Sequence, residues 1–425
     1  MDIGMPAALL WSAVFAVLLL AQWLARAWLL TRQMRHVARH RERVPAALAD
    51  HLDLSTHRRA ADYTVARSQL ALWEASAQTA IVTGWTLLGG LEALDKALLS
   101  WLGPGLTQQV ALVAAFALIG ALLELPLAWW RTFRLEARFG FNRTTLGLWL
   151  ADGLKATLVA ALLGLPLVLA LLALMEHAGP WWWVWAWGLW MGFNLLLMVV
   201  WPLWIAPLFN RFDPLPPEGE LHQRLSALLQ RCGLRAQGVY VVDGSRRSAH
   251  ANAYFTGLGR AKRVVLFDTL LQQLAPAQIE AVLAHELGHA QLRHIPRRLT
   301  LLGVGSAVAL ALLAWLGQQP WFYFGLGVTP DLAGGNAARA LLLFLLVLPQ
   351  AGFWAAPLMA AWSRRDEFAA DAYAARHADA RALRDALLRL HRDNAATATP
   401  DPWYVRFFYS HPPLLQRLQR LPAAA

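Results

Sequence analysis

Seven stretches of the chain are long and apolar enough to cross a bilayer as helices. A membrane-spanning helix needs about 20 mostly apolar residues. Such runs occupy residues 5–24, 75–99, 107–130, 156–174, 181–205, 299–316 and 338–361. The second run is the weakest, because Glu92, Asp95 and Lys96 lie in its far half. The pattern predicts a mainly α-helical protein with seven transmembrane helices, the last two forming a hairpin.

The charge of the connections predicts an orientation. Arginines cluster between the first and second runs and between the third and fourth, whereas the connections 103–109, 176–180 and 317–337 contain no Lys or Arg. The positive-inside rule therefore places the N-terminus outside and the polar segments in the cytoplasm. We expect an N-terminal membrane domain over 1–205, a cytoplasmic segment over 206–298, a membrane hairpin over 299–361 and a C-terminal cytoplasmic segment over 362–425.

The composition agrees with a membrane protein. Of the 425 residues, 57% are hydrophobic and 15% are charged, and 22 are Trp, a residue that concentrates where membrane meets water. The net charge of +11 comes from short basic blocks beside apolar runs, so we expect no nucleic-acid partner. A single cysteine excludes an internal disulfide and a cysteine-based zinc cluster. The Arg- and Ala-rich composition indicates a bacterial plasma membrane.

The first cytoplasmic segment combines strands with a helix. Short β-type runs at 238–242, 251–256 and 263–267 predict strands, the last two joined by a glycine-bearing loop at 257–260. From Pro276 the apolar residues recur at helical spacing. This predicted helix contains His285, Glu286 and His289.

The motif His285-Glu286-Leu287-Gly288-His289 has the spacing of a zinc peptidase site. Residues four apart share a helix face, so both imidazoles can reach one Zn2+ ion. Glu286 can then act as general base on a water molecule. Two surface histidines on a cytoplasmic helix would be the structural alternative.

A catalytic zinc usually takes a third protein ligand. Ile295 occupies the position where a third histidine would follow in the extended motif, and His294 is expected on another helix face. Asp366, Glu367 and Asp371 remain, just after the last span on the cytoplasmic side. We assign Glu367 as the ligand and Asp371, four residues on, as the hydrogen-bond partner of a ligand histidine. Alternatively, these acids form surface ion pairs with Arg364 and Arg365.

These motifs resemble those of a known family, the type I CAAX prenyl endopeptidases, which are zinc-dependent membrane proteases. The matching stretches are FGFN at 139–142, PLFN at 207–210, SAHANAYFTG at 248–257, VVLFDTL at 264–270, the zinc helix, EFAAD at 367–371, and YSHPP at 409–413 with Arg417. They extend over nearly the whole chain.

The resemblance implies further roles. His411 would help to stabilise the tetrahedral oxyanion, and Arg417 would support it or hold a substrate carboxylate. Asn252, Ala253, Tyr254 and Phe255 would hydrogen-bond an extended peptide at a sheet edge. Without the resemblance, His411 is a turn residue before two prolines.

The sequence thus predicts a membrane-embedded zinc metalloendopeptidase whose cytoplasmic, zincin-like α+β domain is split by the last membrane hairpin. The resemblance implies a peptide or protein substrate, in this family one with a prenylated C-terminus. A quality-control protease without a prenyl requirement is the alternative within the enzyme class. A transporter or scaffold with a vestigial zinc site is the alternative outside it. The partners are this substrate and the bilayer, and nothing in the sequence indicates an oligomeric state.

Overall fold

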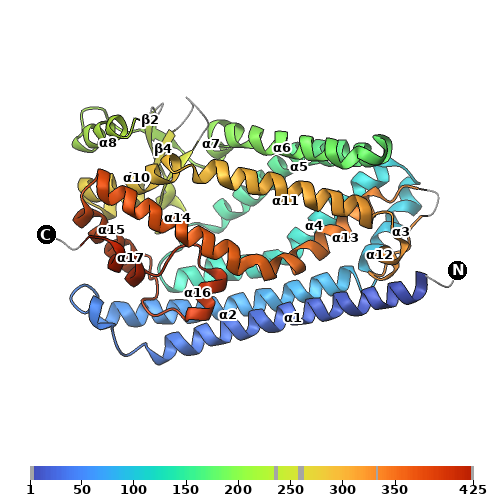
Figure 1. The fold of residues 1–425 in the computed structure, drawn as a ribbon, viewed down its shortest axis with the longest axis horizontal. Coiled ribbons are helices and arrows are strands. Elements are labelled where there is room, and N and C mark those ends of the chain that lie inside the picture. Colours follow the sequence, from blue (N-terminus) through green and yellow to red (C-terminus); the bar gives the residue numbers. More distant parts are fainter. Residues whose placement is uncertain (1–3, 234–237, 257–262, 332–333, 423–425) are drawn as a thin grey trace.

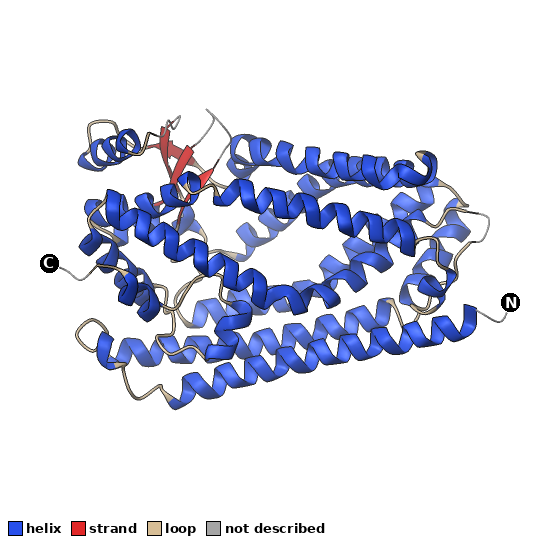
Figure 2. Ribbon diagram, in the orientation of Figure 1, coloured by secondary structure: helices blue, strands red, loops and turns tan. Residues whose placement is uncertain are grey.

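The computed structural model of the chain describes residues 4–233, 238–256, 263–331 and 334–422, which form an elongated, mainly helical molecule (Figures 1 and 2). The N-terminus lies at one end with α3 (Gly90–Leu102) and α12 (Pro320–Phe324). The other end holds the strands together with α8 (Glu220–Arg231), α9 (Asp268–Gln273), α10 (Pro276–Gln291), α15 (Ala380–Asp393) and α17 (Leu414–Arg420). Long helices connect the two ends.

Six helical stretches among the described residues are long and apolar enough to cross a membrane: Met5–Arg39, Leu106–Glu136, Leu146–His177, Gly179–Phe209, His294–Leu316 and Ala337–His377. They contain α1 (Gly4–Arg39), α4 (Leu106–Trp130), α5 (Leu146–His177), α6 (Trp182–Val200), α7 (Ala206–Phe209), α11 (His294–Leu316), α13 (Ala337–Gly352) and α14 (Ala356–His377). In the apolar windows of α4 and α5 only 6% of residues are buried inside the protein, so these surfaces are available to lipid. The chain is an integral, multi-pass membrane protein.

The predicted second span, 75–99, is wrong as a single helix. Its residues belong to α2 (Leu54–Trp85), which runs beside α1, and to α3, with a break at 86–89 (Figure 1). Gly89 has φ +74°, a left-handed conformation that favours glycine. A Cβ at Gly90 would lie 2.6 Å from the carbonyl oxygen of Gly84. Glycines therefore permit the turn.

One of the charged residues that made 75–99 a weak candidate for a membrane span, Asp95, forms a buried ion pair. Asp95 in α3 is buried, and its Oδ2 lies 2.7 Å from Nη2 of Arg339 in α13. Gln108 donates its Nε2 hydrogen to Asp95 Oδ1 over 2.8 Å. A buried charge is tolerated only when it is paired in this way.

The strands form one four-stranded sheet in the order β1-β2-β4-β3, built from β1 (Phe212–Pro214), β2 (Gly238–Val242), β3 (Ala253–Thr256) and β4 (Arg263–Phe267). Strands β2 and β4 are parallel, while β1 and β3 pair antiparallel to them at the two edges. The three predicted strands are present. The predicted loop at 257–260 lies outside the described residues.

Two large hydrophobic cores correspond to the two ends of the molecule. One contains Phe15, Leu112, Leu172 and Phe322 from the membrane helices. The other joins Leu225, Val264 and Leu283 to Tyr373, Leu383 and Leu421, which follow the membrane hairpin in the sequence. The segments before and after the hairpin therefore share one core, which brings α10 against α14.

Candidate metal centre and active site

Helix α10 presents its two histidines to α14 through a very close approach of the two helices. Leu283 and Leu287 are buried in the core, which fixes the rotation of α10. A Cβ at Gly288 would lie 3.1 Å from the Cα of Ala370 in α14. A glycine facing an alanine lets the helix backbones come close enough for Glu367 to reach the histidines.

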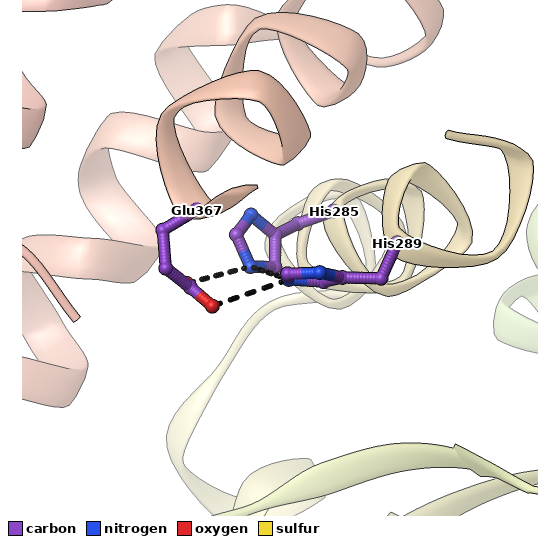
Figure 3. A group of neighbouring side chains, drawn as sticks. All are labelled: His285, His289 and Glu367. Carbon is purple, nitrogen blue, oxygen red and sulfur yellow. Dashed lines mark hydrogen bonds and ion pairs between the residues drawn. The ribbon is translucent and has the colours of Figure 1, made fainter. Parts of the chain in front are cut away.

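Donor atoms of three side chains converge where α10 meets α14, with both carboxylate oxygens of Glu367 facing the imidazoles (Figure 3). Nε2 of His285 lies 3.3 Å from Nε2 of His289 and 3.4 Å from Oε2 of Glu367, and His289 Nε2 lies 3.3 Å from Glu367 Oε1. With ligand bonds of about 2.0–2.1 Å, the edges of a tetrahedron around Zn2+ measure about 3.3–3.4 Å. Oε2 of Glu367 is also buried without a hydrogen-bond partner. The side chains therefore fit one tetrahedral metal ion.

His285 is held from behind by Asp371. Nδ1 of His285 lies 2.9 Å from Oδ1 of Asp371, whose carboxylate also accepts two hydrogen bonds from Arg417. Burial acts to raise the pKa of Asp371, but the hydrogen bonds from Arg417 and His285 outweigh it and hold that pKa below its usual value. The resulting carboxylate orients the imidazole with Nε2 toward the donor triangle. Arg417 is thus engaged with Asp371.

His289 has a partner that sequence reasoning missed. Its Nδ1 lies 2.9 Å from Nδ1 of His294, and His294 Nε2 lies 3.6 Å from Asp366 Oδ1. The expectation that His294 lies on another helix face assumed a continuous helix. Instead α10 ends at Gln291, and Arg293, with φ +56°, turns the chain so that α11 begins at His294. The signal available in the sequence was only a histidine five residues after His289.

Glu286 and His411 lie beside the donor triangle without belonging to it. Burial raises the pKa of the Glu286 carboxyl, and this carboxyl forms no ion pair with any described residue. Nε2 of His411 lies 3.4 Å from Glu367 Oε1, and its side chain is 63% exposed. An exposed imidazole at this position can reach a molecule bound at the site.

The predicted peptide-binding residues lie at one edge of the described sheet, near α10. Strand β3 contains Ala253, Tyr254 and Phe255 and is the last strand of the sheet on its side. Asn252 directly precedes it and is exposed, with its Oδ1 accepting a hydrogen bond from the Ala253 N–H over 2.8 Å. Strand β3 also contacts α10, so a peptide paired to this edge would run past the metal centre.

A large apolar cavity lies among the membrane helices and reaches residues adjacent in sequence to two residues of the site. It has a volume of about 1020 Å³ and is lined mainly by Leu, Val, Ala, Trp and Phe side chains of α5, α6, α11, α13, α14 and α16 (Pro402–Phe408). Asp366 and Ser410 also line it, and these residues are the neighbours of Glu367 and His411. An apolar substrate group could therefore reach the site from within the bundle.

The membrane helices and the His–His–Glu triangle together define a membrane metallopeptidase. Comparison with known proteins gives the family. Residues 33–211 match the family model described as CAAX prenyl protease N-terminal, five membrane helices, and residues 216–425 match peptidase family M48.

Similar proteins cover most of the chain. CAAX prenyl protease 1 homolog of Oryza sativa is 36% identical over 73% of this chain and 72% of its own length. CAAX prenyl protease 1 of Saccharomyces cerevisiae is 29% identical over 97% and 95%. The crystal structure of S. mikatae Ste24p superposes with a TM-score of 0.90 at 28% identity, covering 97% of this chain and 99% of that one. The chain belongs to peptidase family M48, alongside the CAAX prenyl protease 1 homologues, which confirms the predicted family and a metalloendopeptidase activity.

Proposed function

We propose that this chain is a zinc-dependent endopeptidase that removes short C-terminal peptides from prenylated substrates. The observation that carries the proposal is the cluster of His285, His289 and Glu367, which could hold one metal ion, together with an apolar cavity that reaches the neighbouring residues Asp366 and Ser410. The names of the relatives specify prenylated CAAX sequences, and the cavity has the chemistry to accept a prenyl chain.

His285, His289 and Glu367 would hold one Zn2+ ion, which supplies a Lewis acid for the peptide carbonyl and makes water acidic enough to attack near neutral pH. Glu286 accepts the proton of the attacking water and passes it to the leaving amine. Burial raises the pKa of Glu286, which makes its carboxylate a stronger proton acceptor.

The remaining side chains orient the substrate and the ligands. His411 donates a hydrogen bond to the oxyanion, a role supported by its 3.4 Å distance from Glu367. Asn252, Ala253, Tyr254 and Phe255 bind the substrate backbone along the outer edge of β3. Asp371 orients His285, and Arg417 acts through Asp371, because both of its hydrogen bonds to carboxylate oxygens go there.

We further propose that 206–298 and 362–425 form one cytoplasmic, zincin-like peptidase domain interrupted by the hairpin 299–361, with 1–205 as the membrane domain and the N-terminus outside. The shared hydrophobic core and the arginine-rich connections support this arrangement. The bacterial plasma membrane rests on composition alone, since the relatives named above are eukaryotic.

The test uses a farnesylated CAAX peptide and its unmodified twin with detergent-purified protein. Glu286→Gln, which keeps the size of the side chain and removes its basicity, is the blank. We expect the farnesylated peptide to be trimmed faster and the blank to be inactive, as read by mass spectrometry. Equal cleavage of both peptides, or of unfolded chains alone, would instead favour a membrane quality-control protease. Bound zinc without any cleavage would favour a transporter or scaffold.

Zinc stoichiometry separates the ligand from its neighbours. Glu367→Gln should lower the zinc content measured by elemental analysis, because it replaces an anionic ligand atom by a neutral amide. Glu286→Gln should leave the content unchanged. Full zinc occupancy in Glu367→Gln would move the third ligand to Asp366 or Asp371.

A further inference from the structure

A second, polar cavity lies next to the start of β3. Its volume is about 850 Å³, and it is bounded by α2, by the π-helical turn Arg131–Glu136, by the stretch preceding β3 and by the loop 394–397. Arginine, glutamate, histidine, amide and hydroxyl side chains line it, among them Gln33, Arg67, Glu136, Arg247, His250 and Asn394. None of these residues has a role in the mechanism above.

One arginine of this polar cavity, Arg67, makes no direct ion pair among the described residues, although its charge acts on Glu136 and on the Tyr63 hydroxyl. Glu136 accepts hydrogen bonds from Tyr63 over 2.8 and 2.9 Å and lies 3.6 Å from His250 Nε2. Arg247 is engaged by both carboxylate oxygens of Asp152. Arg67 lies against the Tyr63 ring, 5.4 Å from its centroid, and forms no ion pair with any acid in the described part of the chain.

A buried hydrogen-bond donor in the same cavity also lacks an acceptor of normal geometry. Gln33 is 1% exposed, and its Oε1 accepts the Asp401 N–H over 2.7 Å. Its Nε2 is buried and makes no hydrogen bond of normal geometry among the described residues, although it interacts with the Tyr409 side chain. A buried donor without a good acceptor is unfavourable, and an anionic or carbonyl oxygen bound in the cavity would satisfy it. Gln33 and Arg67 can therefore both donate hydrogen bonds to an oxygen atom of a molecule bound in the polar cavity.

The polar cavity is continuous with the peptide-binding edge. Ser248, His250, Ala251 and Asn252 line it and lead directly into β3. At the other end of β3, Phe255 lines a smaller pocket of about 360 Å³ with the apolar residues Leu197, Met198, Trp201 and Ile295. The strand therefore runs from a polar, cationic end to an apolar end.

This polarity gives a bound peptide its direction. A substrate with a free carboxylate at its C-terminus would direct that carboxylate to the polar, Asn252 end of the strand. Its chain would then run antiparallel to β3, the pairing that is slightly more stable per residue. The three residues after a prenylated cysteine span about 10 Å when extended, which suits a cavity beginning at the strand.

We propose that the polar cavity binds the C-terminal carboxylate of the peptide that is cut off, with Arg67 and Gln33 as its donors. This inference rests on the proposed function and adds the feature that makes the enzyme act near a chain end. Arg417, the other candidate for this carboxylate, already donates from Nε and Nη2 to Asp371. Arg67, and not Arg417, is therefore the residue that determines specificity for a free C-terminal carboxylate.

The test compares a farnesylated CAAX peptide bearing a free C-terminal carboxylate with the same peptide bearing a C-terminal amide. For the unmodified enzyme we expect kcat/KM for the acid to exceed that for the amide by roughly ten- to a hundredfold, as for loss of a charge-assisted hydrogen bond. In Arg67→Gln this ratio should fall towards one, because kcat/KM should decrease for the peptide acid and stay unchanged for the peptide amide. Arg67→Lys should keep part of it.

Two further variants test the site without removing Arg67. Gln33→Glu preserves the acceptor for the Asp401 N–H but points a carboxylate at the cavity, so cleavage of the acid should fall and cleavage of the amide should not. Arg43→Gln, at an exposed arginine outside the cavity, should behave as the unmodified enzyme. Activity on the amide reports that each variant is folded.

Equal Glu286-dependent cleavage of acid and amide by the unmodified enzyme would overturn this inference and leave the proposed function standing. An unchanged acid-to-amide ratio in Arg67→Gln and Gln33→Glu would also overturn it. Absence of any Glu286-dependent cleavage would remove the proposed function, and this inference with it.

Discussion

At the scale of single residues, each of the two histidines proposed to bind zinc is oriented by a different kind of partner. His285 is bonded to a carboxylate that is itself held by Arg417, whereas His289 meets a second imidazole, His294. Asp366 accepts a hydrogen bond from Arg297 and lies beside His294, which completes the chain behind His289. Such partners fix the tautomer and rotation of a ligand, so their loss weakens metal binding.

His294→Ala should therefore lower zinc affinity by about 10- to 100-fold while leaving all three ligands in place. Competition with a chromogenic chelator measures the change. His51→Ala, at an exposed histidine far from the motif, is the matched control. Equal affinity in the two variants would mean that His294 serves only packing.

A buried histidine outside the active site predicts sensitivity to acid. Burial, with the nearby His57, lowers the pKa of His391 in α15 to about 4, and its Nε2 has no hydrogen-bond partner among the described residues. The folded state thus keeps the ring neutral where the unfolded chain, with a pKa of about 6.5, takes up a proton. Stability should fall as pH drops from about 6.5 to about 4, by at most about 3 kcal/mol.

Melting curves in detergent at pH 7.5 and pH 5 check this. His391→Leu cannot take up the proton, so its melting temperature should change less between the two pH values than that of the unmodified protein. The same change in both proteins would assign the acid sensitivity to other groups.

At the scale of secondary-structure elements, the site depends on how closely α10 and α14 approach. A Cβ at Gly288 would lie 3.1 Å from Ala370 Cα and 3.2 Å from Tyr373 Cβ, closer than ordinary van der Waals contact. Backbone atoms cannot move aside as a flexible side chain can. Any larger residue must push the helices apart and carry Glu367 away from the histidines.

Gly288→Val should destabilise the protein by about 1–3 kcal/mol and reduce its zinc content, because overpacking shifts the backbone. Thermal melting and elemental analysis report the two effects. Gly192→Val in α6, where a Cβ would meet nothing within 4 Å, controls for replacing a helical glycine. Full zinc content in Gly288→Val would show that the interface can repack.

At the scale of the whole molecule, the membrane bundle and the peptidase end meet at the apolar cavity. A lipid-modified residue could occupy this cavity while its peptide lies along β3. Gly305 in α11 lines the cavity, and a Cβ there would meet nothing within 4 Å. A large side chain at this position would fill space reserved for the lipid.

Gly305→Trp should therefore reduce cleavage of a farnesylated peptide while sparing its unmodified twin. Gly120→Trp in α4, outside the cavity lining and also free of contacts within 4 Å, is the control. The ratio of kcat/KM for the two peptides is the measurement. An equal loss on both peptides would indicate general damage to the bundle.

The sequence by itself determined the features that depend on local pattern. Long apolar runs identified six membrane helices, because a bilayer requires about 20 apolar residues in one stretch. The four-residue spacing of His285 and His289 was enough to predict a shared metal, since a helix places both on one face. Elimination among few acids led to Glu367, whose carboxylate does meet both imidazoles.

Tertiary structure decided what depends on contacts between distant residues. After the break between α2 and α3, Asp95 in α3 forms an ion pair with Arg339, which lies 244 positions further along the chain. Arg417 is drawn to Asp371 by a contact that spans 46 residues, and the turn at Arg293 returns His294 to His289. The polar cavity gathers Gln33, Arg67, His250 and Asn394 from four separate segments. The local sequence pattern does not predict these contacts, because they form only when the packing of helices and strands brings side chains from distant parts of the chain together.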